Sequence, residues 1–158
     1  MNTQYLTFQL AGDEYGFGIL RVKEILEYDT LTRVPSAPAA VRGVINLRGA
    51  VVPVVDLAVR FGLPATAVTR RTCVVIVEVR TGEEDIVMGV MVDAVSQVMD
   101  LAESDIEPPP PFGAKVRVDY LVGMGKIGKG FVLILDIDRL LAGLDVSEPA
   151  LTESVSTT

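Results

Sequence analysis

Residues 41–56 contain the most suggestive chemistry in the chain, an arginine placed at a tight turn between two apolar stretches. The pattern predicts a strand that ends at Asn46-Leu-Arg-Gly49 and a second strand over 51–55. Gly49 suits a turn position with positive φ, which glycine reaches without steric cost. Arg48 beside it would stand at the edge of a sheet, where a guanidinium can bind a carboxylate through two hydrogen bonds. An ordinary hairpin with a solvated arginine explains the segment equally well, because most arginines at turns are inert.

The composition excludes several kinds of catalytic and metal chemistry. The chain has no histidine and one cysteine, so histidine-based catalysis, a phosphohistidine and a Cys/His zinc site are excluded. The carboxylates at 13–14 and 83–85 lie in glycine-containing segments that are typical of solvated turns. Cys73 begins an apolar strand and is best interpreted as a small core residue without a disulfide. We therefore expect a protein that is not an enzyme and that has no metal or cofactor.

A glycine-rich segment at 123–130 offers an alternative function. Residues 123–128 match the pattern G-x-G-x-x-G, and 123–129 match G-x-x-x-x-G-K. A phosphate-binding loop also needs a Ser or Thr after the lysine and a helix whose amides face the phosphates. Here Gly130 follows Lys129, and an apolar strand comes next. The segment is better interpreted as a β turn, and a small nucleotide-binding protein stays the less favoured alternative.

Length and charge narrow the class of protein further. The 158 residues suit one compact domain with a substantial core. A net charge of −7 without a basic cluster argues against binding to nucleic acid or to anionic membrane surfaces. No apolar run approaches the ~18–20 residues of a membrane span, and the first residues lack a signal-peptide pattern. We expect a cytoplasmic location without membrane insertion.

The apolar patterns predict mainly β structure with a few short helices. Three hairpins are predicted: 4–10 with 14–19, 72–79 with 85–92, and 121–127 with 130–135. Three short helices are predicted at 38–43, 57–61 and 137–144. Four prolines make 107–112 an extended connector, which we favour over a polyproline ligand. Residues 1–145 then form one domain, and the polar segment 146–158 is predicted to be a disordered tail.

The two halves of the chain resemble each other. Residues 15–26 align without gaps with 88–99, and 51–57 align with 131–137. Each half has a hairpin, then apolar residues at i, i+3 and i+6, and then a strand that ends in aspartate. This repeated order predicts two similar small barrels packed on each other.

Over nearly its whole length the chain resembles the CheW family of bacterial chemotaxis coupling proteins. The most specific motif is the turn Asn46-Leu-Arg-Gly49 followed by Val52-Pro-Val-Val-Asp-Leu57. Further matching segments are 14–19, 22–25, 32–35, 41–45, 90–93, 95–98, 120–123 and 133–140. The same domain type occurs in the kinase CheA and in CheV. This chain has no kinase segment, no histidine and no room for a receiver domain, so the stand-alone adaptor fits best.

The resemblance implies two packed, five-stranded, SH3-like β-barrel subdomains. It also implies a non-enzymatic adaptor that couples the cytoplasmic tips of chemoreceptors to the histidine kinase CheA, at membrane-associated receptor arrays. A CheW-like scaffold of a non-flagellar pathway, such as gliding, pili or gene regulation, is an alternative with the same motifs.

The resemblance also implies roles for individual residues. Val22 and Glu24 match the segment that meets the regulatory domain of CheA. Arg48 matches the turn arginine needed for coupling, and the analogy lets it pair with Glu24. A further set of residues matches the groove that takes the helical tip of the receptor: Gly89, Val95 and Val98. Plain core packing is the alternative interpretation for these positions.

Overall fold

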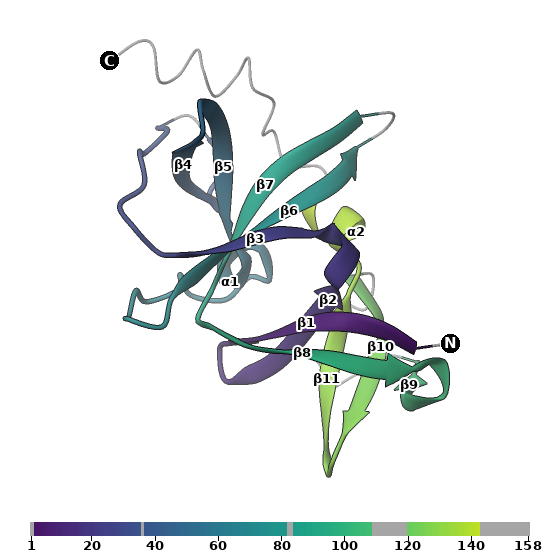
Figure 1. Ribbon diagram of the computed structural model, residues 1–158. Coiled ribbons are helices and arrows are strands. Elements are labelled where there is room, and N and C mark those ends of the chain that lie inside the picture. Colours follow the sequence, from purple (N-terminus) through teal and green to yellow (C-terminus); the bar gives the residue numbers. More distant parts are fainter. Residues whose placement is uncertain (1, 36, 82–83, 109–119, 143–158) are drawn as a thin grey trace.

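The computed structural model describes residues 2–35, 37–81, 84–108 and 120–142, and it shows two β-sheets with a few short helices (Figure 1). The six-stranded sheet, which we call lobe 1, has the order β8 (Ala94–Ala102), β1 (Asn2–Leu10), β2 (Asp13–Gly18), β11 (Gly130–Leu135), β10 (Leu121–Ile127), β9 (Ile106–Glu107). The five-stranded sheet, lobe 2, has the order β3 (Val22–Glu27), β6 (Cys73–Thr81), β7 (Glu84–Val92), β5 (Ala50–Asp56), β4 (Val41–Leu47). The prediction of a mainly β protein with two subdomains is confirmed, and the two-residue strand β9 is the addition that gives lobe 1 a sixth strand.

The short helices follow or connect the strands. They are η1 (Ile19–Arg21), α1 (Leu57–Arg60), η2 (Glu103–Asp105) and α2 (Ile137–Leu141). Asp56 is the last residue of β5, and Asp136 directly follows β11. The Asp56 carboxylate accepts from the Ala58 amide of α1, and the Asp136 carboxylate accepts from the Asp138 and Arg139 amides of α2. The aspartate that recurs in the two halves of the sequence is therefore a helix N-cap.

All three predicted hairpins form, but one predicted helix is wrong. Residues 38–43 were expected to be helical, yet Val41 begins β4 and pairs with Val55. The local helical signal is satisfied by one turn, in which the Val41 amide donates to the Pro38 carbonyl at 2.9 Å. Pairing with β5 buries Val41 and Val44, and this burial outweighs the weak local preference.

The remaining element predictions are confirmed as far as the structure describes them. The helix expected at 57–61 is α1, with Phe61 as its C-cap. The helix expected at 137–144 is α2, which ends at Leu141. In the predicted connector 107–112, Glu107 belongs to β9, and residues from 109 onward lie outside the described residues. The predicted tail 146–158 also lies outside them.

The two halves of the sequence exchange their first hairpins. β1–β2 of the first half joins β8 to β11 of the second half, and β6–β7 of the second half joins β3 to β5 of the first half. The third strand of the first half, β3, pairs with β6 of the second half, and its equivalent β8 pairs back with β1. Lobe 2 is consequently one continuous segment from β3 to β7, whereas lobe 1 combines β1 and β2 with the later strands β8 to β11 (Figure 1).

The main hydrophobic core lies between the lobes. Aromatic side chains of lobe 1, among them Phe8, Tyr15 and Phe17, share one buried cluster with aliphatic side chains of lobe 2 such as Val75 and Val77. Smaller clusters fill the inside of each lobe. This shared core makes the lobes a single packed unit.

Polar contacts of α2 add to the connection between the lobes. The Arg21 guanidinium contacts the Asp138 carboxylate at 2.7 Å, and the Arg80 amide donates to the same carboxylate at 2.8 Å. Arg60 of α1 donates to the backbone carbonyls of Leu140 and Ala142 at 2.7 and 2.8 Å. The end of lobe 1 is thereby fixed to α1 and β6 of lobe 2.

Candidate functional site

The turn between β4 and β5 holds Arg48 in an unusual backbone conformation. Leu47 pairs with Ala50, so the turn has two residues, Arg48 with φ of 51° and Gly49 with φ of 90°. Two positive φ angles are the pattern of a type I′ hairpin turn, which favours Asn-Gly. The Asn46 side chain accepts a hydrogen bond from the Gly49 amide at 2.8 Å and tightens the turn. A non-glycine residue with positive φ adds backbone strain on the order of 1 kcal/mol. For the turn alone, asparagine or glycine would therefore be more favourable than arginine at position 48.

Arg48 and Glu24 form the ion pair that the family resemblance implied. Arg48 Nη2 lies 2.5 Å from Glu24 Oε1, with 74% of the arginine side chain and 29% of the glutamate side chain exposed. Glu24 lies on β3, at the opposite edge of lobe 2 from the β4–β5 hairpin. The segment that follows β3 also reaches β4, where Thr32 and Val44 exchange backbone hydrogen bonds of 3.0 and 2.8 Å. The pair therefore lies where the sheet curls back on itself.

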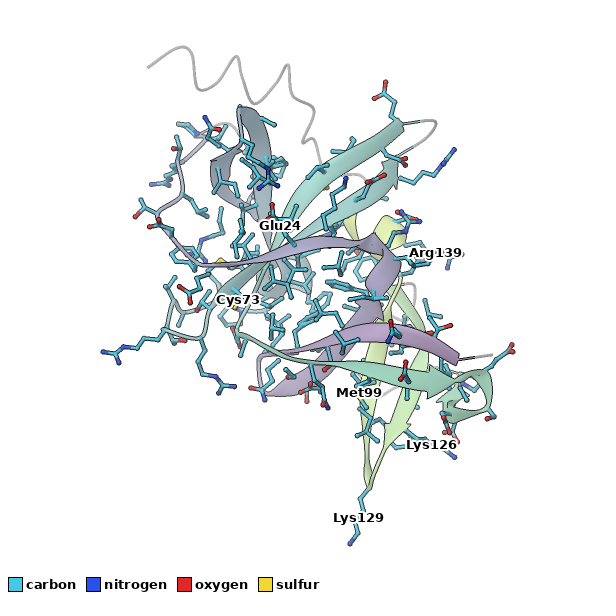
Figure 2. All side chains as sticks on the ribbon, viewed as in Figure 1. Glu24, Cys73, Met99, Lys126, Lys129 and Arg139 are labelled. Atoms are coloured by element: carbon cyan, nitrogen blue, oxygen red, sulfur yellow. The ribbon has the colours of Figure 1, made fainter. Side chains whose placement is uncertain are left out.

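The strand that carries Glu24 presents an apolar residue to solvent. Ile25 lies on the edge strand β3 beside charged residues, and it is 44% exposed. Figure 2 labels its neighbour Glu24. Val22 is half-buried and packs against the core between the lobes. Lys23 donates to Glu78 at 3.0 Å, and this hydrogen bond lowers the pKa of the Glu78 carboxyl. We call the surface formed by Glu24, Ile25 and Arg48 the closing edge.

Ile25 was missed by the interpretation of the sequence. An isoleucine flanked by Glu24 and Leu26 gives no sign of which neighbour faces water. Only the pairing of β3 with β6 settles that Leu26 packs into lobe 2 while Ile25 stays exposed.

The three residues assigned to a receptor groove differ in burial. Gly89 is buried in β7, and a Cβ there would lie 2.7 Å from Val74 Cγ1 and 3.2 Å from Val54 Cγ2. Val95 is half-buried against the core between the lobes. Val98 is 49% exposed on β8, opposite the buried Leu6 of β1. Of the three, Val98 has the most exposed side chain, and the buried Gly89 is closely surrounded by Val74 and Val54.

A buried ionic cluster supports the β4–β5 hairpin. The interpretation of the sequence did not identify this cluster. The carboxylate of Asp56 is fully buried and contacts Arg42 Nη1 at 2.7 Å. The same carboxylate accepts hydrogen bonds from the amide of Ala58 and from the amide and hydroxyl of Thr66, at 3.1, 2.9 and 2.9 Å. A buried charge of this kind is tolerated because its lone pairs are satisfied. The signal in the sequence was the aspartate that ends the strand, but its partners are distant along the chain.

The glycine-rich segment forms a hairpin. Gly123 and Gly125 lie within β10, where a Cβ would meet Ile106 at 2.7 Å and Leu101 at 2.6 Å, respectively. The strand β11 follows directly, so between 121 and 135 there is no helix to receive a phosphate. Gly123 allows β9 to approach β10, and Gly125 leaves room for Leu101 of β8.

In the ranges that the structure describes, no three His, Cys, Asp or Glu side chains are grouped so that they could hold a metal ion. None of the helices in the same ranges combines the length and the apolar character needed to cross a membrane.

Comparison with known proteins gives consistent matches. A family model described as CheW-like domain matches residues 4–145. The chemotaxis protein CheW of Klebsiella aerogenes is 37% identical over 153 residues, which cover 97% of this chain and 88% of that protein. CheW of Bacillus subtilis is 39% identical over 140 residues, which cover 89% and 85%. The crystal structure of the scaffolding protein TtCheW from Thermoanaerobacter tengcongensis superposes with a TM-score of 0.79 at 32% identity, and covers 89% of this chain and 88% of that one.

Proposed function

This chain belongs to the CheW family of chemotaxis scaffold proteins, which are not enzymes, and on that premise we propose that it couples the cytoplasmic tips of chemoreceptors to the regulatory domain of the kinase CheA. The complex would form at membrane-associated receptor arrays. The proposal divides the surface into a kinase contact at the closing edge and a receptor contact that includes Val98.

The observation that carries the proposal is the exposed arginine of the closing edge. Arg48 occupies a strained backbone position, and its guanidinium is mostly in solvent. An exposed ion pair of this kind contributes at most about 1 kcal/mol to folding. The side chain therefore contributes little to the stability of the fold, and binding is the function that explains it.

The geometry of the closing edge suits a protein partner. Glu24 holds the guanidinium at the junction of the two sheet edges, and the exposed Ile25 supplies apolar contact area next to it. An apolar centre with a charged pair at its border is the usual composition of a small protein interface. Val22 would support this surface from below, because it packs against the core between the lobes.

The test of the kinase contact is a calorimetric titration with the regulatory domain of CheA from the same organism. The wild-type protein should bind saturably, and Glu24→Ala should weaken binding because it releases the guanidinium from its position. Glu27→Ala is the matched control, since Glu27 is an exposed glutamate on the same strand. Absence of binding, or an equal loss for both variants, would contradict the kinase contact.

The test of the receptor contact uses two exposed valines. Val98→Asp should weaken binding to a soluble receptor signalling fragment, because the aspartate would place a charge of β8 against the apolar face of the receptor helix. Val122→Asp is the control, since Val122 is 55% exposed on β10 and lies outside the proposed contact. If both variants lose receptor binding equally while they stay folded, Val98 has no specific role.

A further inference from the structure

A pocket of about 980 Å³ lies at the junction of the two lobes, apart from both contacts proposed above. One side is formed by lobe 1, where the β1–β2 turn meets the start of β8, and it includes Gln9 and Asp93. The other side is formed by Ala58 of α1 and by the loop that leads to β6, residues 63–71. Cys73, labelled in Figure 2, marks the end of this loop at the start of β6.

Both sides of the pocket are held in place without a ligand. The loop is fixed by Thr66, whose amide and hydroxyl donate to the buried Asp56, and whose carbonyl accepts from Arg42 at 3.3 Å. On the opposite side, the Ala11 amide donates to the Asp93 carboxylate at 2.9 Å, and the Asp93 amide donates to the Gln9 carbonyl at 3.0 Å. The pocket is consequently preformed, which lowers the entropic cost of binding.

The lining combines an apolar base with a pair of arginines at its border. Leu63, Pro64, Ala65 and Ala67 contribute to the apolar part. Arg70 and Arg71 follow, and both residues are exposed. Within the ranges that the structure describes, neither guanidinium has an ion-pair partner.

The backbone around the two arginines is a hydrogen-bonded turn. The Thr69 amide donates to the Thr72 hydroxyl at 2.8 Å, and the Thr72 amide donates to the Thr69 carbonyl at 3.2 Å. The Arg71 amide also donates to the Thr69 hydroxyl at 3.1 Å. This turn fixes the backbone of two adjacent, exposed arginines on a chain whose net charge is −7.

We propose that this pocket is the docking site for an acidic peptide segment of a partner protein, with a bulky apolar side chain in the pocket and carboxylates on Arg70 and Arg71. The chemistry follows from the lining, because the apolar base rewards burial of a large side chain and the paired guanidinia select carboxylates. A free anion would leave the apolar base unused. An acidic partner is repelled by the rest of this acidic chain, so the two arginines determine where it binds.

The test is an NMR titration of the full ¹⁵N-labelled chain with the peptide acetyl-Glu-Glu-Leu-Phe-Glu-Glu-amide. Saturable shifts should be confined to the pocket lining, that is, to residues around Gln9, Asp93 and 63–71. A peptide with Gly-Gly in place of Leu-Phe, and one with lysine in place of glutamate, should each bind at least about tenfold more weakly. Shifts elsewhere, no saturable shifts, equal binding of either comparison peptide, or the same shifts with free glutamate would overturn the proposal.

Variants of the protein separate the two parts of the site. The double variant Arg70→Glu/Arg71→Glu should lose at least about tenfold in affinity, because both carboxylate contacts become repulsive. Ala67→Phe should lose a similar factor by filling the pocket while both arginines remain. Lys129→Glu is the control for changed charge, because Lys129 lies at the β10–β11 turn, far from the pocket (Figure 2). Unchanged affinity in the double variant, or an equal loss in Lys129→Glu, would overturn the proposal.

Discussion

Replacing Arg48 by glycine should abolish kinase coupling and leave the stability of the fold almost unchanged. Two opposite effects on the free energy of unfolding are expected. Glycine relieves the positive φ of 51°, which costs a non-glycine residue on the order of 1 kcal/mol, although glycine also gives the unfolded chain more freedom. Loss of the exposed pair with Glu24 removes at most about 1 kcal/mol. The net change should be within about 0.5 kcal/mol.

The chain offers a matched control in a second turn of the same shape. Ala11 has φ of 50° and is followed by Gly12 with φ of 87°, and Leu10 pairs with Asp13. Ala11→Gly therefore measures the relief of backbone strain without the loss of an ion pair, and it should stabilise the protein by about 0.5 kcal/mol. The difference between Ala11→Gly and Arg48→Gly gives the contribution of the Glu24–Arg48 pair to folding.

The assay is urea denaturation of both variants, combined with titration against the CheA regulatory domain. The expected result for Arg48→Gly is an unchanged midpoint with lost binding. If Arg48→Gly is destabilised by more than about 1.5 kcal/mol while Ala11→Gly is not, Arg48 supports the fold and the argument for a binding role is refuted.

Three further predictions concern buried groups. Burial, with a smaller effect of Asp13, raises the pKa of Tyr15 to about 12 from 10.0. As the pH rises, Tyr15 in the unfolded chain loses its proton before Tyr15 in the folded chain, so the free energy of unfolding should fall by on the order of 2 kcal/mol between about pH 10 and 12. In urea titrations, Tyr15→Phe should lack this part of the decline. An equal decline in the variant would argue against the raised pKa of Tyr15. Asp56→Asn should cost about 3 kcal/mol in chemical denaturation, because it leaves buried donors and Arg42 without their charged acceptor, and a cost below about 1 kcal/mol would contradict this role. Gly89→Ala should cost about 1–3 kcal/mol, measured as a lower melting temperature, since its Cβ would lie 2.7 Å from Val74 Cγ1, and an unchanged melting temperature would show that β7 can shift.

Local patterns in the sequence were sufficient for the hairpins and for most of the helices. Alternation of apolar residues, with Gly12, Gly49 or Gly128 at the turn, indicates each pair of adjacent strands because the hydrogen bonds are local. The helix expected at 38–43 failed since Val41 and Val44 are buried by pairing with β5, a contact that no local pattern contains. The internal repeat indicated two subdomains, but not which half of the sequence each strand would join.

The candidate site depends on long-range geometry, and the sequence indicated it only in part. Arg48 was recognisable from its turn, whereas its contact with Glu24 arises because the two edges of lobe 2 meet. The exposure of Ile25 and the burial of Gly89 follow from the same curvature and pairing. Residue types thus indicate candidates, and the fold decides which of them reach the surface.

The exchange of hairpins between the two halves of the sequence affects the order in which the two lobes can fold during synthesis. The hairpin β1–β2 leaves the ribosome first, but its neighbours in the sheet are β8 and β11, which are made much later. Tyr15 pairs with Leu133, so β2 lacks this neighbour until β11 has been made. Lobe 2 has all of its strands within one continuous segment, so its sheet can form before strands β8 to β11 of lobe 1 have been made. We therefore expect that lobe 1 closes only after β11 has been made, and that the nascent β1–β2 hairpin is the segment most exposed to aggregation and to chaperones.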